Sequence, residues 1–337
     1  MLPTPGRLEL KVEAINLEHH DGHEVKHLSE IDRRSLLKGI GVGVTLAAFG
    51  DFIAAAATTS AVKLPGFSAF ASTVKVTKGS KYYLIESNGI PAHRMMVGIK
   101  SWQQQIPTPQ PYSGTNSWSL PIKPMLASQP ISNVGNFLRG AIAIAANGIP
   151  IFNALNNRGE DAYLAGELDD FGGHCGQADD YHYHTAPLHL QSAVGARNPI
   201  AYALDGFAIY GALEPDGSPL AKLDSYNGHI YKRGQYHYHG TVNYPYINGG
   251  FRGVVTQRDG QVDPQALTHG FRPPLPPLRG ATITSCQNLG GGHFILTYMV
   301  NGETTVLDYV ADLSTVTIQT TVGSGTSTQQ VYQRMSK

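Results

Sequence analysis

The tetrapeptide Tyr181-His182-Tyr183-His184 occurs a second time, 55 residues later, as Tyr236-His237-Tyr238-His239. The match extends upstream, because an aspartate and a Gly-His pair precede each copy at identical distances. Both copies therefore fit the pattern D-x3-G-H-x6-Y-H-Y-H without a gap. A match of this length is not expected by chance, and we interpret it as an internal duplication. The upstream positions are Asp169, Gly173 and His174 in the first copy and Asp224, Gly228 and His229 in the second.

Alternating histidines in an extended chain favour a metal site. Side chains alternate between the two faces of a strand, so His182 and His184 share one face and the tyrosines share the other. Histidines two residues apart have backbones about 6.5–7 Å apart, and their imidazoles can tilt toward one ion. Neutral imidazole suits copper and zinc among other metals. The pattern therefore predicts a copper or zinc site with the ligands His182, His184, His237, His239, His174 and His229.

The surroundings of these histidines leave several arrangements open. A carboxylate or carbonyl usually accepts the second ring N–H of a metal-bound imidazole, so Asp169, Asp224 and Asp205 are predicted to orient the histidines. The two copies either share one ion about a pseudo-two-fold axis or hold one ion each. The alternative to a metal is a structural role, in which Tyr and His form cross-strand pairs.

An apolar hairpin precedes each copy of the motif. Residues 141–145 lead to the turn Asn147-Gly148 and to residues 149–152, and residues 200–210 repeat this order around Asp205-Gly206. Asn-Gly and Asp-Gly are strong hairpin signals, and consecutive apolar residues indicate strands that are buried on both faces. The sequence thus predicts a mainly β fold. Duplicated units, each a hairpin followed by the Tyr-His-Tyr-His strand, would form a sandwich-like or barrel-like domain over residues 62–270, with repeat units near 139–190 and 198–245.

The N-terminal segment has the order of an export signal. Arg33-Arg34-Ser35-Leu36-Leu37-Lys38 is a twin-arginine pattern, residues 39–52 are mostly apolar, and small residues follow at Ala54–Ala57. This order predicts a twin-arginine signal over residues 1–57 and a periplasmic or extracellular location. The apolar run is short and Asp51 interrupts it, so no stable membrane span is expected after cleavage.

The C-terminal part of the chain is predicted to be a separate β segment. Residues 271–279 are rich in proline and are expected to form a linker. Residues 293–300 and 305–310 alternate around Asn301-Gly302, which predicts a hairpin within a β appendage over residues 280–337. This segment carries no motif that indicates chemistry.

Composition restricts the classes of partner. The 337 residues contain 25 Lys+Arg and 25 Asp+Glu, so the formal net charge is zero. Without a basic excess, nucleic acid is not expected as a partner. The sequence does not identify a protein partner, and the partner that the motifs predict is a metal ion.

The two cysteines, Cys175 and Cys286, leave three states open. They form a disulfide, which an exported protein permits, or Cys175 supplies a thiolate ligand beside His174. The third state is that of buried thiols that only pack.

Together these motifs resemble the YHYH protein family, a bacterial group of exported proteins named for the tetrapeptide. The resemblance covers roughly residues 80–256. It implies an extracytoplasmic β-rich domain with a metal site and no defined activity. Related sequences usually carry a cysteine before the Gly-His step, whereas Cys175 follows it here. The residues that carry the resemblance are Asn88-Gly89-Ile90-Pro91-Ala92-His93, the Gly-His and Tyr-His-Tyr-His strings, and 205–211.

Two further classes of function stay open. A metal-dependent hydrolase or oxidoreductase requires an open coordination position and a nearby acid or base. The sequence has no G-x-S-x-G elbow, and its H-E-x-x-H string, His23 to His27, lies within the predicted signal segment, so no catalytic residue is assigned. A surface module with structural YHYH strands would instead bind carbohydrate or peptide through its aromatic loops, whose candidate residues are Trp102, Tyr112, Trp118, Tyr244 and Tyr246.

Overall fold

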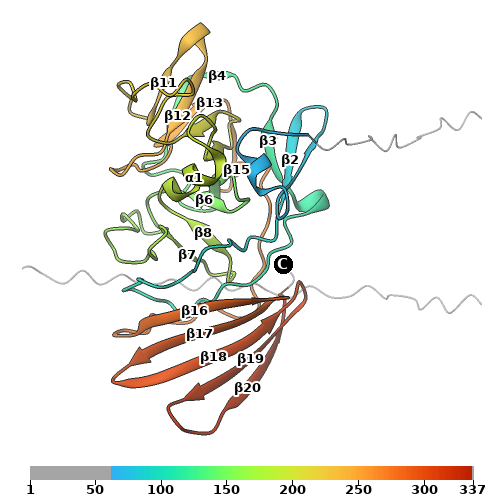
Figure 1. The fold of residues 1–337 in the computed structure, drawn as a ribbon, viewed down its shortest axis with the longest axis vertical. Helices are drawn as coiled ribbons and strands as arrows, with labels where there is room; N and C mark the ends of the chain where they lie inside the picture. Colours follow the sequence, from blue (N-terminus) through green and yellow to red (C-terminus); the bar gives the residue numbers. More distant parts are fainter. Residues whose placement is uncertain (1–61, 336–337) are drawn as a thin grey trace, which may run out of the picture. The chain divides into compact units, whose positions relative to one another are not determined.

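The computed structural model describes residues 62–335, and these residues are predominantly β. Five sheets pack around a shared apolar core, and none of the sheets described closes into a barrel. The prediction of a mainly β, sandwich-like fold is therefore confirmed (Figure 1). The predicted export signal at residues 1–57 lies outside the described residues.

The largest sheet has eight strands, and its two halves correspond strand for strand. From one edge to the other the order is β11-β12-β10-β9-β5-β6-β8-β7, so the second unit occupies one half and the first unit the other. The unit boundary is the antiparallel pair β5–β9. The strands are Ala141–Ala145 (β5), Pro150–Phe152 (β6), Gly173–Cys175 (β7), Tyr181–Tyr183 (β8), Ala201–Ala203 (β9), Ala208–Tyr210 (β10), Gly228–Ile230 (β11) and Tyr236–His239 (β12).

Small residues hold the centre of this sheet together. Ala143 pairs with Ala203 and Ala145 with Ala201 across the unit boundary, and all of β5 is buried. The predicted turns follow both inner strands, where Gly148 and Gly206 have φ of 79° and 91°. Positive φ is accessible to glycine at no steric cost, which explains why each hairpin turns there.

The Tyr-His-Tyr-His strands are anchored by their tyrosines. Tyr181 donates its hydroxyl to Oδ2 of Asp169 at 2.8 Å, and Tyr236 donates to Oδ2 of Asp224 at 2.9 Å. A Cβ built on Gly173 would lie 2.6 Å from Cζ of Tyr181, and a Cβ built on Gly228 would lie 2.6 Å from Cζ of Tyr236. Such an approach is too close for a side chain, so the glycine of each Gly-His pair leaves room for a tyrosine ring.

Three smaller sheets and short helices complete the main part of the domain. Their strands are Lys75–Lys78 (β1), Tyr82–Glu86 (β2) and Trp118–Pro121 (β3) in one sheet, Leu126–Ser132 (β4) with Gly250–Gly253 (β13), and Thr256–Arg258 (β14) with Gln261–Asp263 (β15). The helical turns are Phe67–Phe70 (η1), Gly114–Asn116 (η2), Leu188–Leu190 (η3), Gln191–Val194 (α1) and Lys232–Gly234 (η4).

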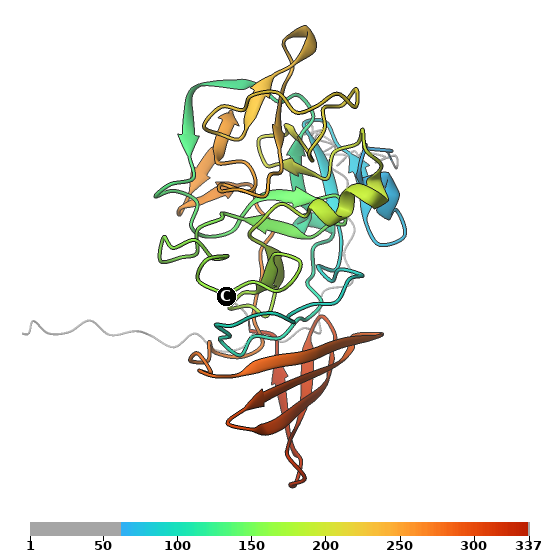
Figure 2. The ribbon, with the colours of Figure 1, turned by 60° about the vertical axis from the view of Figure 1, so that its left-hand side comes forward.

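The C-terminal segment is a five-stranded antiparallel meander, which Figures 1 and 2 show in orange to red. Its central hairpin turns at Asn301 and Gly302, both with positive φ, as the sequence predicts. The strands are Thr282–Gly290 (β16), His293–Val300 (β17), Glu303–Ala311 (β18), Thr315–Val322 (β19) and Thr328–Gln333 (β20).

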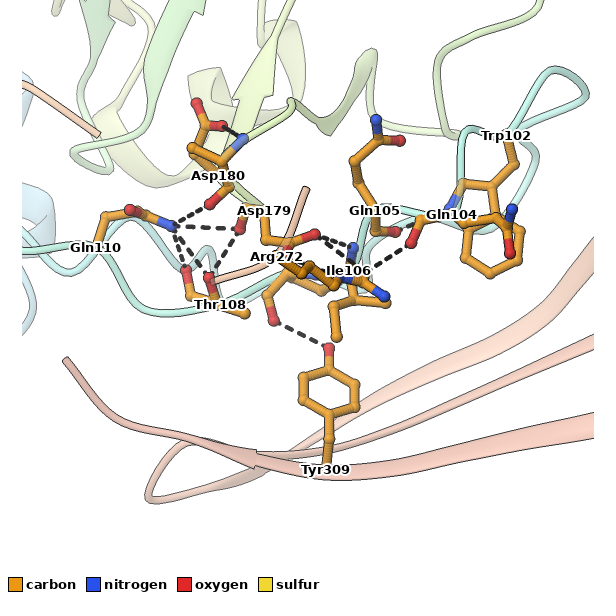
Figure 3. Close-up of polar contacts among 12 residues, drawn as sticks. Trp102, Gln104, Gln105, Ile106, Thr108, Gln110, Asp179, Asp180, Arg272 and Tyr309 are labelled. Carbon is orange, nitrogen blue, oxygen red and sulfur yellow. Dashed lines mark hydrogen bonds and ion pairs between the residues drawn. The ribbon is translucent and has the colours of Figure 1, made fainter. Parts of the chain in front are cut away.

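This meander is attached by buried polar contacts (Figure 3). Tyr309 of β18 donates its hydroxyl to the carbonyl oxygen of Pro107 at 2.9 Å. Arg272, in the proline-rich segment, donates to the carboxylate of Asp179 at 3.2 Å and to the carbonyl oxygen of Gln104 at 2.6 Å. The predicted linker at residues 271–279 is thus held against the domain, at Pro276 and Leu278 as well as at Arg272.

Among residues 62–335, every helix is too short or too polar to cross a membrane.

The two tyrosine anchors differ in burial, and this difference predicts unequal mutational effects. Asp169 is 7% exposed and also accepts three backbone N–H groups, whereas Asp224 is exposed. Each buried donor without a partner costs about 1–3 kcal/mol, whereas exposed donors bind water. We expect Asp169→Ala to lower the free energy of unfolding by about 3 kcal/mol and Asp224→Ala by about 1 kcal/mol. Urea unfolding of the metal-free chain measures both, and equal losses would contradict the assigned roles.

Candidate metal centres

Strand pairing brings three histidines together in each unit. β7 runs antiparallel to β8 with His174 directly opposite His182, and β11 pairs with β12 in the same way, with His229 opposite His237. Directly opposed residues project to the same face, and so do residues two positions apart. His184 and His239 therefore complete one trio in each unit.

The first group consists of His174, His182 and His184. Nε2 of His184 lies 3.1 Å from Nε2 of His174 and 3.2 Å from Nε2 of His182. The side chains of His182 and His184 are buried, and the ring of Phe152 stacks on that of His182 with centroids 3.8 Å apart. Three ring nitrogens thus converge on one point from rings that packing holds in place.

The second group adds a carboxylate to its three histidines. Nε2 of His237 lies 2.9 Å from Nε2 of His239 and 3.1 Å from Nε2 of His229. The carboxylate of Glu214 approaches all three, with Oε1 3.1 Å from His229 and Oε2 3.1 Å from His237 and 3.6 Å from His239. Glu214 is 1% exposed, so this is a buried, four-membered group.

Backbone carbonyls orient the rings so that Nε2 faces inward. Nδ1 of His184 donates to the carbonyl oxygen of Asn153 at 2.5 Å, and Nδ1 of His239 donates to that of Gly211 at 2.8 Å. The neutral ring then carries its proton on Nδ1 and its lone pair on Nε2, which is the form that binds a metal. Nδ1 of His182 is 3.0 Å from the carbonyl oxygen of Asp180.

Burial favours the neutral form of four of these imidazoles, because it lowers their pKa. It lowers the pKa of His184 to about 3 and that of His237 to about 4, with neighbouring histidines adding to the effect. Burial also lowers the pKa of His174 and of His239. For Glu214, burial by itself raises the pKa, but a backbone hydrogen bond from Ala221 and the nearby histidines outweigh it, so the pKa is lowered.

These distances fit the coordination sphere of a small ion. Four ligands 2.0–2.1 Å from a tetrahedral zinc lie about 3.3 Å from one another. The separations given above range from 2.9 to 3.6 Å, and all ligand atoms of each group lie within 4.8 Å of one another. The residues present therefore fit a tetrahedral metal ion.

The predicted orienting aspartates do not face the histidines. Asp169 and Asp224 bind tyrosine hydroxyls, and Asp205 accepts the hydroxyl of Tyr238 at 2.6 Å. The reason is the alternation of the strand, which puts the tyrosines and their carboxylates on the face opposite the histidines. Backbone carbonyls orient the rings in their place.

The two groups are too far apart to share an ion. Between β8 and β12 the sheet order counts five inter-strand steps. At about 4.8 Å a step, this separation is about 24 Å. Of the two arrangements that the sequence left open, the structure has the one with a separate group in each unit.

Neither cysteine forms a disulfide or joins a metal-ligand group in residues 62–335. Cys175 and Cys286 are free and buried, and burial raises the pKa of both thiols, to about 12 for Cys286. Cys175 pairs with Tyr181 across β7 and β8 and so projects away from His174. Of the three predicted states, both cysteines therefore adopt that of buried thiols that only pack.

Glu214 is the site residue that sequence reasoning missed. It lies in the loop after β10, outside the repeated motif, and its counterpart in the first unit is a different residue. No motif marks it in the sequence; in the structure it lies three residues after Gly211, whose carbonyl oxygen binds His239.

A cavity adjoins the first group. Its volume is about 520 Å³, and His174, His182 and His184 contribute to its wall. No residue of the second group lines this cavity. Trp102, Tyr112 and Trp118, three of the aromatic residues predicted for a binding surface, line it as well.

The hydrogen bonds to Nδ1 predict the tautomers of the metal-free chain. His184 and His239 should carry the ring proton on Nδ1, because each donates to a backbone carbonyl. Long-range ¹H–¹⁵N correlation spectra of the labelled chain separate the two ring nitrogens, and added zinc should shift Nε2. A proton on Nε2 of either ring in the metal-free chain would contradict the geometry.

Comparison with known proteins supports the assignment of the motif. The family model described as YHYH protein matches residues 117–219, which contain the whole first histidine group and Glu214. No curated protein and no solved structure gives a significant match. The family match over residues 117–219, which hold the first tetrapeptide, supports a YHYH-motif protein, and the second tetrapeptide lies on the equivalent strand of the sheet.

Proposed function

We propose that this chain is an exported protein that binds two metal ions, copper or zinc, one in each histidine group. The observation that carries the proposal is the convergence of three Nε2 atoms in each unit, at separations of 2.9–3.2 Å. Cross-strand Tyr–His pairing alone does not require such convergence, because histidines that only pack have no reason to direct their lone pairs to one point.

The electrostatics of the groups support a bound cation. A neutral ring that donates from Nδ1, as those of His184 and His239 do, directs the lone pair of its Nε2 into this small volume. Facing lone pairs in a buried site repel one another, and buried polar atoms without partners are costly. A divalent cation at the centre accepts all three lone pairs at once, which relieves both penalties.

The ligand types favour zinc or copper over other metals. Imidazole suits both, and a four-ligand group with three histidines and a carboxylate fits tetrahedral zinc. The carboxylate of Glu214 is a hard ligand, which weighs against copper(I) in the second group. Zinc is therefore our preferred ion there, and copper remains the alternative in the first group.

The place of action belongs to the same proposal. The twin-arginine pattern Arg33-Arg34, the apolar run and the small residues before Ala57 support export to the periplasm or beyond. The twin-arginine route carries folded proteins, so the buried sites are expected to be loaded with metal before export.

Metal content tests the proposal directly. The purified full chain should contain about two ions, because each group offers a complete set of inward-facing donors. His182→Ala with His184→Ala should remove one ion, His237→Ala with His239→Ala should remove the other, and all four changes should remove both. Elemental analysis of the dialysed protein gives the counts.

A matched variant controls for the loss of histidine as such. His269 and His293 lie outside both groups, so replacing both by alanine should leave the count at two. A wild-type chain that binds no stoichiometric transition metal, while its fold is intact by circular dichroism, would overturn the proposal.

Export is tested with the signal itself. Arg33→Lys combined with Arg34→Lys should block export, so that the chain accumulates inside the cell with its leader attached. Immunoblots of cell fractions show the outcome, and unchanged export of the variant would reject the twin-arginine assignment.

A further inference from the structure

The two metal groups differ at one equivalent position. Asn156 in the first unit and Glu214 in the second are 58 residues apart, which is the offset of the two hairpins. Their backbones make the same bonds: Asn156 N donates to Glu160 O at 2.8 Å, and Glu214 N donates to Ser218 O at 3.0 Å. A short antiparallel bridge flanks each residue at the same offset. The difference is therefore one of side chain on a shared loop conformation.

Glu214 closes the second group. Both carboxylate oxygens face histidine Nε2 atoms, and the backbone N–H of Ala221 also donates to Oε1 at 3.0 Å, which holds the carboxylate in place. Three imidazoles and one carboxylate would supply all four ligands of a tetrahedral ion. This is the ligand count of structural zinc sites, which leave no position for an outside ligand.

Asn156 leaves the first group with three ligands. Its Nδ2 donates to Glu160 at 3.1 Å and to Glu167 at 3.3 Å, and its Oδ1 accepts the backbone N–H groups of Arg158 and Glu160. Both ends of the amide are thus engaged away from the histidines. Three protein ligands with a fourth position open is the arrangement of catalytic metal sites.

The three histidines of this group and Asn156 all line the cavity of about 520 Å³, so a ligand in the cavity can approach the fourth position. The charged side chains in its wall, apart from the histidines, are those of Arg139, Arg158, Glu167 and Asp180. Glu167 is buried and paired with Arg158, and Asp180 is buried, 3.5 Å from Nδ1 of His182. The two acids offset the two arginines, and Glu160 adds a further negative charge beside Arg158, so a divalent ion on three neutral imidazoles would still leave the site with a net positive charge.

We propose that the first group is an open metal site that takes a small anion from the cavity, whereas the second group is closed and structural. The inference rests on the proposed function, because it assigns different roles to the two ions. Anions with an oxygen or nitrogen donor, carboxylates among them, are the class of ligand that a positive site with one free position accepts.

Cobalt(II) and azide test the open position. Cobalt replaces zinc in tetrahedral sites, and its visible spectrum reports a change of ligand. In the full chain loaded with two cobalt ions, azide should change the spectrum of one ion only. The response should persist in His237→Ala with His239→Ala and vanish in His182→Ala with His184→Ala.

Replacing Asn156 by the glutamate of the second unit compares a group with three ligands and the same group with four. Asn156→Glu should supply the missing ligand and abolish the azide response, while the chain still binds two cobalt ions. Asn156→Gln is the matched control, because it adds the same length without a charge and should keep the response. This pair decides the question even where the double-histidine variants fail to fold.

The class of ligand is tested with benzoate and benzamide, which have the same shape and differ in charge. Benzoate should perturb the cobalt spectrum at a concentration about tenfold lower than benzamide, a difference of about 1.4 kcal/mol. Equal potency of the two would overturn the preference for anions.

The outcomes separate the two proposals. A folded chain that binds no cobalt or zinc rejects the proposed function itself. Two bound ions with no azide response, an equal response from both ions, or an unchanged response in Asn156→Glu would reject the open and closed roles while leaving metal binding intact.

Discussion

The alternation of side chains along β8 and β12 is the constraint on which both sites depend. Each strand presents tyrosines to one face, where they bind aspartates, and histidines to the other, where they form the candidate ligand groups. Hydrogen bonds from Tyr181 to Asp169 and from Tyr236 to Asp224 tie the strands to the preceding loops. These loops also carry the Gly-His pairs, whose glycines admit the tyrosine rings. The anchored tyrosine face therefore sets the register that brings a third histidine opposite the other two.

The same frame, built twice, supports two chemically different sites. Strand order, turns and the carbonyls that bind His184 and His239 all correspond between the units. What differs is the residue on one loop, a carboxylate in Glu214 and an amide in Asn156. A carboxylate adds a ligand and a negative charge, whereas the amide of Asn156 binds its own loop and Glu167. One side chain thus separates a group of four potential metal ligands from a group of three.

The remainder of the fold positions the cavity beside the first group. The loop that carries Trp102 is held by Arg272 and by the C-terminal meander through Tyr309 and Pro107. Asp179, which binds Arg272, is followed directly by Asp180 and the first Tyr-His-Tyr-His strand. The C-terminal segment carries no metal ligand in the part of the chain that the structure describes, yet it braces the wall of the cavity. It therefore contributes to the candidate site by holding the loop that carries Trp102.

The sequence by itself determined the mainly β fold, the two units, the hairpin turns at Gly148 and Gly206, and the six histidines that converge. These features are local, since they follow from the period of a strand, from turn chemistry and from repetition. Tertiary structure alone decided that the histidines form two groups, that the aspartates bind tyrosines, that the cysteines stay free, and that Glu214 joins the second group. Each of these depends on which strands are neighbours and which loops cross them. Such contacts join residues far apart in the chain, and no spacing within the motif encodes them.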